Sequence, residues 1–555
     1  MNAEHICDVL KNRGHIDNTQ ADDILDEVKN TGDTIFHVLK NFGLFEDDAQ
    51  IYQIVAEDLG ASFMDLKGFK PPVALLEMIP PHLARLHGAL PINFDDRGLH
   101  VALVDPLNPQ TLEDLRFAVG KDVQLVIARP DKIEDLINES YGAGGEDLGD
   151  ILAEFGEADP ANTKDLEAEA NSAPIVRYVD LVLYQAIKER ASDIHFEPFD
   201  KEFKIRYRVD GALLEIAPPP ARLSTTVISR IKVMGNLNIA ERRLPQDGRI
   251  MKTVAGRPVD MRVSTLPTIH GESVVLRVLD RQSSNLDLSN LGMPKFIYDY
   301  VNQVIVRPNG IFIVTGPTGS GKTTTLYACL KRINTIDAKL LTVEDPVEYD
   351  IDGIIQVPVN ENIGVTFAKV LRAFLRQDPD RIMVGEIRDA ETGQIAIQAS
   401  LTGHLVLTTL HTNDAPGAVT RLVDMGLEPF LVSASLEGVL AQRLIRTICK
   451  ECKVSYEPTD AILTQLGISP HEIGDKHFLT GEGCEECGQS GYHGRKGLYE
   501  LLNITDPIRD MITERTPTVV LKQKAIELGL TTLREDGLRN IYEGYTTIEE
   551  VLKYT

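Results

Sequence analysis

The sequence predicts a multidomain α/β protein with a parallel-sheet domain in its C-terminal half. The chain has 555 residues, a length that suggests three or four domains at roughly 150 residues each. From about residue 300, short continuous apolar runs end in polar or charged clusters, as in IFIVTG, LLTVEDP, RIMVGEIRD and HLVLTTLHT. Strands buried on both faces of a parallel sheet have this pattern, and ligands collect at the carboxyl ends of such strands.

Composition excludes several classes of protein. Hydrophobic residues make up 43% and charged residues 25%, which is ordinary for globular proteins and excludes global disorder and fibres. The formal net charge of −26 argues against a nucleic-acid binder that relies on a broad basic surface. No run approaches the ~18 apolar residues of a transmembrane helix. The acidic N-terminus MNAEHICDVL has no signal-peptide core, so we expect a cytoplasmic protein.

We expect residues 1–142 to form an N-terminal domain, helical over 1–60 and α/β over 61–142. Residues 1–60 hold 13 acidic and 4 basic side chains, a net charge of −9. The stretch VLKNRGHI from Val9 recurs 29 residues later as VLKNFGLF from Val38. Each copy combines an amphipathic stretch with a glycine that can end a helix. In 61–142, short strands with Asp/Gly turns precede amphipathic helices.

Residues 143–170 have the composition of a linker. They hold nine acidic side chains and one basic side chain and are poor in large apolar residues, so we expect an acidic, flexible segment.

A second domain is expected over 171–285. In FKIRYRV (203–209), apolar residues alternate with basic ones, so the basic side chains share one face of a half-buried strand that ends in an Asp210-Gly211 turn. The arginines of this domain could reach a neighbouring subunit's nucleotide as arginine fingers, or they could form a charged solvent face. Spacing alone favours the charged face. These arginines are Arg206, Arg208, Arg230, Arg262 and Arg277.

The phosphate-binding signature GxxxxGK[ST] lies at residues 316–323, within the part of the chain that has the parallel-sheet pattern. It follows the apolar run IFIVT and precedes the helix-like TTLYACLKRI, which is the context that the motif requires. The glycines let backbone N–H groups surround a β-phosphate, the lysine can neutralise β/γ oxygens, and the threonine can ligate Mg²⁺. The residues are Gly316, Pro317, Thr318, Gly319, Ser320, Gly321, Lys322 and Thr323.

Two acidic residues end neighbouring apolar runs. Glu386 ends RIMVGE, which resembles a Walker B strand with Glu in place of Asp, and Glu344 ends LLTVE. Two acids beside one triphosphate allow one to serve the metal while the other accepts a proton. We favour Glu344 for water activation and Glu386 for the metal, and the reverse division stays open.

His404 and His411 bracket one predicted strand. Each could sense the γ-phosphate or join neighbouring strands by hydrogen bonds, and for His404 the two interpretations are equally supported. Their spacing of seven places them on opposite faces of a strand, which excludes a shared zinc ion.

Four of the six cysteines form two CxxC pairs, Cys449 with Cys452 and Cys484 with Cys487, separated by 31 residues. Six cysteines are too few for a disulfide scaffold in a chain of this length. Four thiolates complete a closed tetrahedral Zn²⁺ site, and such a site is structural because no coordination position stays open for water.

Several stretches resemble one protein family. They are GPTGSGKT, LTVEDPVEYDIDG from Leu341, LRAFLRQDPDRIMVGEIRDAETGQIAIQASLTGHLVLTTLHTNDAP from Leu371, and ASDIHFEPF, RIKVMGNLNIAERRLPQDGRI and DMRVSTLPTIHGE in the second domain. With the CxxC pairs, they are similar to the GspE/PulE family of secretion ATPases, which drive type II secretion and have close relatives in type IV pilus assembly. The resemblance is dense over 172–500 and looser over 501–555. In 1–142 it extends only to the family's variable N-terminal domain.

The resemblance implies a hexameric cytoplasmic ATPase that uses ATP and Mg²⁺ and holds a structural Zn²⁺. It implies a PAS-like domain over 171–285 and a RecA-like domain over 286–555, which includes a zinc module at 445–500 and C-terminal helices. The family's Walker A, Asp box, Walker B and His box fall on Gly316–Thr323, Glu344-Asp345, Glu386, and His404 with His411. Arg206, Arg208 and Arg277 lie where the family has contacts to a neighbouring subunit. The zinc module argues against a pilus-retraction role, because retraction motors generally lack it.

The resemblance also implies partners. They are a homo-hexamer, the cytoplasmic domain of an inner-membrane assembly protein, and a polytopic platform protein, so that the chain is peripheral at the inner membrane. Some relatives bind cyclic di-GMP through a duplicated R-x-G motif seven residues before a second glycine. Here His5 and Thr34 replace the arginines, and Cys7 and Phe36 replace the glycines, so we expect no cyclic di-GMP binding.

Several alternatives remain open. A type IV pilus assembly (extension) motor has the same chemistry with a different cargo, and the exported substrate is not encoded in any motif. A nucleic-acid translocase is disfavoured by the acidic pI and by the absence of a Lys/Arg-rich arm or an aromatic stacking stretch. A catalytically dead scaffold is disfavoured because Glu344, Glu386 and Lys322 are all present.

Overall fold

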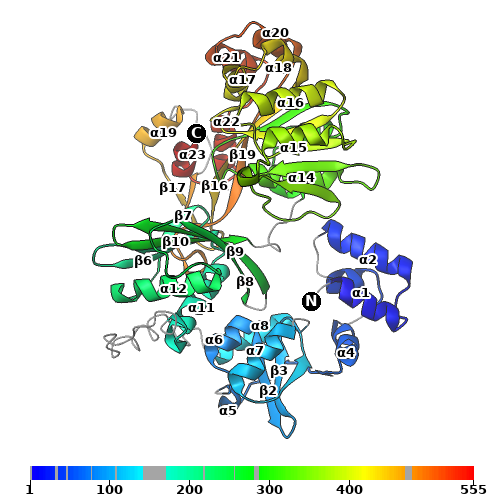
Figure 1. Cartoon of the computed structure of the whole chain (residues 1–555), viewed down its shortest axis with the longest axis vertical. Helices are drawn as coiled ribbons and strands as arrows, with labels where there is room; N and C mark the ends of the chain where they lie inside the picture. The colour runs from blue at the N-terminus through cyan, green and yellow to red at the C-terminus, as the bar shows by residue number, and fades with distance from the viewer. Residues whose placement is uncertain are drawn as a thin grey trace. The chain divides into compact units, whose positions relative to one another are not determined.

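The structure is a computed structural model of the chain. It describes residues 3–31, 35–45, 48–76, 78–106, 109–141, 170–216, 219–254, 257–279, 287–468 and 478–555 (Figure 1). The chain divides into two compact units, Met1–Arg281 and Gln282–Thr555. The predicted linker over 143–170 lies outside the described residues except for Ala170.

Helices precede the first strand. They are α1 (Ala3–Asn12), α2 (Asn18–Thr31), α3 (Ile35–Asn41) and α4 (Asp48–Asp58). The two copies of the repeat share one geometry, because α1 and α3 each end before a glycine with positive φ, Gly14 at +75° and Gly43 at +68°. The Gly14 N–H donates to the Lys11 carbonyl and the Gly43 N–H to the Lys40 carbonyl, both at 2.9 Å, so each glycine closes its helix.

A four-stranded sheet follows, in the order β1-β4-β3-β2. Its strands are β1 (Ser62–Phe63), β2 (Ala89–Asp95), β3 (Gly98–Leu103) and β4 (Val123–Ile127). The helices of this region are α5 (Val73–Leu76), α6 (Pro81–His87), α7 (Pro109–Val119) and α8 (Pro130–Ser140). Only β2 and β3 pair in antiparallel fashion. Buried Leu99, Val101 and Ile133 belong to one core, which joins the sheet to α8.

The second sheet is six-stranded and antiparallel throughout, in the order β7-β6-β5-β10-β9-β8. Its strands are β5 (Asp193–Pro198), β6 (Phe203–Val209), β7 (Ala212–Glu215), β8 (Gln246–Val254), β9 (Arg257–Thr268) and β10 (Gly271–Leu279). Its helices are α11 (Ala173–Lys188), η1 (Ala221–Leu223) and α12 (Ser224–Met234). Buried Phe203, Ile205 and Tyr207 alternate along β6 with more exposed basic residues, which gives the sheet one apolar and one charged face.

The C-terminal unit is built on a seven-stranded sheet in the order β13-β12-β14-β15-β11-β16-β19. Its strands are β11 (Gly310–Thr315), β12 (Leu340–Glu344), β13 (Ile354–Pro358), β14 (Arg381–Val384), β15 (Leu405–Leu410), β16 (Leu436–Ile448) and β19 (Tyr492–Asn503). All neighbouring pairs are parallel except β16 with β19. Every residue of β11 and β15 is buried, as the continuous apolar runs predict.

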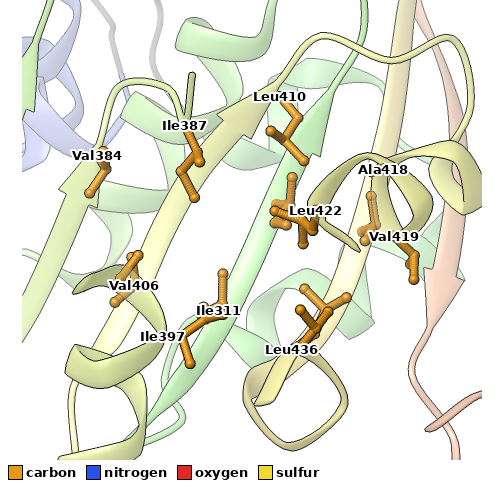
Figure 2. Close-up of a cluster of buried hydrophobic side chains, with 14 of the residues drawn as sticks. Ile311, Val384, Ile387, Ile397, Val406, Leu410, Ala418, Val419, Leu422 and Leu436 are labelled. Atoms are coloured by element: carbon orange, nitrogen blue, oxygen red, sulfur yellow. The ribbon is translucent and has the colours of Figure 1, made fainter. Parts of the chain in front are cut away.

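Helices cover both faces of this sheet. They are η2 (Leu288–Leu291), α13 (Lys295–Val304), α14 (Lys322–Ile333), η3 (Glu361–Ile363), α15 (Phe367–Phe374), α16 (Ala390–Leu401), α17 (Ala415–Asp424) and α18 (Pro429–Ser435). Figure 2 shows the core on one face, where Ile311 and Val406 of the strands meet Ile397 of α16 and Leu422 of α17. Helices α13 and α14 supply the core of the other face.

A small two-stranded sheet and the C-terminal helices complete the unit. They are β17 (Lys453–Tyr456), α19 (Asp460–Leu466), β18 (Phe478–Gly481), η5 (Glu485–Cys487), α20 (Asp506–Thr513), α21 (Thr518–Glu527), α22 (Leu533–Tyr542) and α23 (Ile548–Tyr554). Phe478 of β18 shares a separate buried cluster with Ile541 and Val551. Within the described part of the chain, no helix has both the length and the apolar character needed to cross a membrane.

Candidate functional site

The phosphate-binding signature forms the turn between β11 and α14, at the carboxyl end of β11, which lies between β15 and β16. Gly321 is the N-cap of α14 with φ +86°, and Gly316 and Gly319 have φ +149° and +78°. Three positive φ values in six residues require glycine, because side chains with L configuration rarely adopt this backbone. The turn aims the N-terminus of α14 at the centre of the loop, where a phosphate would meet the helix dipole.

The space around the loop also requires glycine. A Cβ atom on Gly316 would lie 2.4 Å from the carbonyl oxygen of Gln442, and one on Gly321 would lie 2.8 Å from Nε2 of the same residue. The Ser320 hydroxyl is buried and has no hydrogen-bond partner among the described residues. A tight glycine cradle with an unpaired buried hydroxyl fits a bound phosphate group.

Lys322 is folded into this cradle. Only 9% of the residue is exposed, and its Nζ donates to the carbonyl oxygens of Gly316 and Pro317, at 2.9 and 3.0 Å. Burial lowers the pKa of Lys322 from its ordinary value, while the nearby Glu386 carboxylate opposes the shift and Arg443 adds to it. The ammonium group is therefore held without full hydration and is available to an anion.

Glu386 lies in an ionic cluster beside Lys322, two residues beyond the end of β14. Its carboxylate pairs with the Arg388 guanidinium, and His411 Nε2 lies 3.3 Å from the second carboxylate oxygen. Arg388 also reaches Asp345, with Nη1 to Oδ2 at 3.3 Å. The cluster thus joins the carboxyl ends of β12, β14 and β15, and the Glu386 side chain is 16% exposed.

Glu344 has a different environment from Glu386. The residue is 3% exposed, and both carboxylate oxygens accept hydrogen bonds: one from the Tyr327 hydroxyl, the other from Thr342 Oγ1 at 2.5 Å and Gln356 Nε2 at 3.1 Å. This carboxylate is held by protein groups inside the subunit. Its role in water activation remains a prediction, and so does the reverse division, in which Glu344 serves the metal and Glu386 the water. The enclosure leaves Glu386 as the more accessible of the two acids.

The two histidines lie at opposite ends of β15. His411 follows the strand at the edge that carries the phosphate loop, since Thr315 pairs with Leu410. His404 precedes the strand at the other edge, where its Nδ1 lies 2.9 Å from the Ala399 carbonyl oxygen at the end of α16. The structure therefore does not bring His404 to the phosphate loop, because the whole length of the strand separates them. Its contacts fit the structural interpretation.

Three second-domain arginines, Arg206, Arg208 and Arg277, are paired with acids of their own sheet, whereas Arg230 of α12 donates to the Asn171 side chain at 2.8 Å. Arg206 donates two hydrogen bonds of 2.7 Å to Glu197, which raises the pKa of Arg206. Arg277 Nε lies 3.0 Å from Asp193, and Arg208 Nε lies 3.8 Å from the same carboxylate. The Arg277 side chain is 57% exposed.

Sequence reasoning did not single out Arg388 and Arg443. Arg388 belongs to the run that contains Glu386, and its spacing of two from that acid was a usable signal. Arg443 lies on β16, 127 residues beyond Gly316, with 7% of the residue exposed. No motif marks Arg443, and only the pairing of β16 with β11 brings it to the loop.

The four cysteines of the CxxC pairs come together. Their sulfur atoms all lie within 4.8 Å of one another. The Gly483 N–H donates to Cys452 Sγ at 3.3 Å, the Gly491 N–H to Cys487 Sγ at 3.3 Å, and the Cys484 N–H to Cys487 Sγ at 3.2 Å. Backbone N–H groups aimed at sulfur favour thiolates, and four thiolates in this arrangement are suited to a tetrahedral Zn²⁺.

Residues 168–553 match the family described as Type II/IV secretion system protein, and residues 59–147 match the MshEN domain. The chain is 42% identical to the type IV pilus assembly ATPase PilB of Myxococcus xanthus over 538 residues, 96% of this chain and 95% of that protein. It is 52% identical to a type II secretion system protein E of Pseudomonas aeruginosa over 434 residues, 76% of this chain and 86% of that protein.

Solved structures agree with the fold. The ATPase DotB of Legionella pneumophila superposes with a TM-score of 0.50 at 22% identity, covering 71% of this chain and 96% of that one. A structure of MshE with cdg matches 24% of this chain at 24% identity, and its TM-score of 0.22 supports no conclusion about a ligand. The phosphate loop, the family match over 168–553 and the ATPase relatives lead to one conclusion: the chain is an ATP hydrolase and belongs to the Type II/IV secretion system protein family.

Proposed function

We propose that the chain is a hexameric motor that hydrolyses Mg²⁺-ATP at Gly316–Thr323 to power pseudopilus assembly and protein export by a type II secretion system. One observation carries the proposal: Lys322 of the phosphate loop lies near the ionic cluster of Glu386, Arg388 and His411, at the carboxyl edge of the sheet. A cation for the phosphates and an acid for the metal or water then lie near one another at this edge.

Each residue has a role in this proposal. The loop amides and Lys322 bind the phosphates, and Thr323, an exposed residue, would hold Mg²⁺ through its hydroxyl. Glu386 orients either the metal or the attacking water, with His411 and Arg388 fixing its carboxylate. Bound Mg²⁺ would neutralise charge that develops on the phosphate oxygens.

The test is a set of single variants with hydrolysis and nucleotide binding both measured. Lys322→Ala should lose nucleotide affinity and turnover. Glu386→Gln should keep nucleotide but lower turnover by roughly 100-fold or more. Glu344→Gln decides the division of roles: retained turnover assigns the chemistry to Glu386, whereas a loss equal to that of Glu386→Gln restores Glu344 as the base. Undiminished turnover in Glu386→Gln would refute the proposed site.

The tetracysteine cluster is proposed as a structural Zn²⁺ site. The close sulfur set and its three N–H···S contacts support this proposal. Metal analysis of protein purified without chelator should give one Zn²⁺ per chain. Cys484→Ser should lose zinc while nucleotide binding persists, and Glu457→Ala, an exposed acid of the same module, should keep it. Absence of zinc from the wild-type protein would refute the proposal.

The hexamer and its contacts between subunits are also proposals. The second domain would be PAS-like, and Arg206, Arg208 and Arg277 would reach a neighbour's nucleotide after releasing their present acidic partners. Activity per chain should then rise with protein concentration, and Arg277→Ala subunits should depress wild-type activity when mixed. Lys201→Ala, an exposed residue of the same domain, is the matched control. Activity that is proportional to concentration down to the monomer would refute contacts in trans.

Residues 1–142 are proposed as a docking module for the basic cytoplasmic domain of an inner-membrane assembly protein, with a polytopic platform protein as a further partner. The net charge of −9 over residues 1–60 supports a basic partner. Removing residues 1–142 should spare hydrolysis and abolish membrane recruitment. The degraded repeat predicts no cyclic di-GMP binding, although residues 59–147 match the MshEN domain. Calorimetric titration of residues 1–142 with cyclic di-GMP tests this prediction. Micromolar binding would refute our interpretation.

Type IV pilus extension is the second candidate, because PilB of Myxococcus xanthus covers 96% of this chain. Expression in a secretion-defective strain and in a pilus-defective strain separates the two. Restoration of export alone supports type II secretion, and restoration of pili alone supports the extension motor.

A further inference from the structure

Arg443 stands between the phosphate loop and the segment that follows His411. Its Nη1 lies 3.2 Å from where a Cβ of Gly316 would be and donates to the Gln442 carbonyl oxygen at 3.3 Å, so the guanidinium lies beside the first glycine of the loop. Its Nη2 donates to the Asn413 carbonyl oxygen at 2.8 Å. One planar cation therefore spans two segments of the candidate nucleotide site.

The segment after His411 is attached on its other side as well. Thr412 Oγ1 lies 2.8 Å from Thr315 Oγ1, and the Thr412 N–H donates to that Thr315 hydroxyl at 3.0 Å. Thr315 is the last residue of β11, directly before the loop. Arg443 and Thr315 thus hold Asn413 and Thr412, the residues directly after His411, beside the loop.

Arg443 is buried, so its charge needs compensation inside the protein. Ala441 pairs with Glu500 across β16 and β19, which places Arg443 and Glu500 diagonally on one face of the sheet. Glu500 is 1% exposed and accepts from the N–H groups of Ala415 and Leu533, at 2.8 and 3.2 Å. The charges of Glu500 and Asp414 oppose the lowering of the Arg443 pKa that burial causes.

We propose that Arg443 is a positioning residue of the nucleotide site, a second buried cation that strengthens phosphate binding and fixes the distance between Gly316 and Asn413. The proposal rests on the proposed nucleotide site at Gly316–Thr323. Arg443 does not touch the reacting atoms. Its charge adds to that of Lys322 at the loop, and its fork of donors ties the loop to the segment that carries His411.

A structural role and an electrostatic role make different predictions. Arg443→Gln removes a positive charge that interacts with the buried Glu500 and leaves Lys522 as the remaining cation near that carboxylate, which should destabilise the fold. Arg443→Gln combined with Glu500→Gln removes both charges, so stability should recover toward the wild type. Nucleotide affinity should not recover, because the second cation is still missing.

The experiment measures the urea midpoint and the dissociation constant of a fluorescent ADP analogue for the full chain. We expect Arg443→Gln and the double variant both to weaken binding by roughly tenfold. Arg443→Lys keeps the charge but loses the planar fork of donors, so its affinity should fall between those of the wild type and Arg443→Gln. Arg421→Gln, an exposed arginine on α17, should change neither quantity.

Two outcomes would overturn the proposal. One is wild-type nucleotide affinity in a double variant that folds as stably as the wild type. The other is a double variant that regains affinity, relative to Arg443→Gln, in proportion to the stability that it regains. If the single variant does not fold, the double variant and Arg443→Lys still decide the question. Lys322→Ala is measured alongside. Unchanged affinity in Lys322→Ala would refute the nucleotide site itself. If Lys322→Ala loses affinity while the double variant binds normally, only the role of Arg443 is refuted.

Discussion

Glu550 of α23 connects the end of the chain to the strand that leads into the tetracysteine module. The residue is 2% exposed, and its carboxylate accepts from the Arg446 backbone N–H at 3.0 Å and from Arg446 Nη2 at 2.6 Å. The Arg446 guanidinium also lies 3.9 Å from the centre of the Tyr492 ring. Arg446 and Tyr492 belong to β16 and β19, close to Cys449 and Cys487, so Glu550 should hold the base of the module.

The structure sets the size of the effect of Glu550→Ala. The substitution removes two charge-assisted hydrogen bonds and leaves Arg446, whose side chain is 23% exposed, without its carboxylate. Breaking a buried pair on one side costs about 2–3 kcal/mol at this degree of burial. The open population of the module should rise by roughly 30- to 150-fold. Glu550→Gln keeps an oxygen acceptor and should cost about 1 kcal/mol.

Native-state hydrogen exchange over residues 446–456 and 478–495 measures this opening directly, and zinc release to a chromogenic chelator gives a second readout. Exchange of β11 and β15 should be unchanged, because the pair lies at the far end of β16. Glu457→Ala is the control for loss of an exposed acid from the module. Equal protection of the module in Glu550→Ala and Glu457→Ala would show that the pair contributes nothing measurable.

Two further predictions concern the phosphate loop. The first is that Gly316→Ala destabilises the C-terminal unit by about 1–2 kcal/mol more than Gly319→Ala. Both glycines have positive φ, but only a Cβ atom on Gly316 would clash with neighbouring atoms. Equal urea midpoints for the two variants would contradict this prediction. The second prediction is that nucleotide affinity weakens as pH rises, already at pH values below 10.5. Burial lowers the pKa of Lys322, so in the free protein the Lys322 ammonium loses its proton at a lower pH than an ordinary lysine, and phosphate binding must then restore that proton. Affinity for the ADP analogue is measured across pH, and an equally steep decline in Lys322→Arg would exclude Lys322 as the cause.

Local motifs predicted a large part of the candidate site. A phosphate loop needs particular residues at consecutive positions, because the same few residues supply the turn, the amides and the lysine, so Gly316–Thr323 is legible without any tertiary information. The CxxC pairs are legible for a similar reason: each pair supplies two ligands from one turn. The apolar runs of the parallel sheet likewise placed Glu386 and His411 at one edge, since carboxyl ends of parallel strands lie together.

Tertiary structure decided which charged groups face one another. Arg443 and Glu500, whose charges interact in the interior, are 57 residues apart, and the ion-paired Arg446 and Glu550 are 104 apart. Such pairs depend on strand order and register, which no local pattern encodes. The enclosure of Glu344 by Tyr327, Thr342 and Gln356 was unpredictable for the same reason. The sequence by itself determined where phosphate and metal chemistry is available, while packing determined which acids are enclosed, because burial and pairing of a charge are properties of the folded neighbourhood.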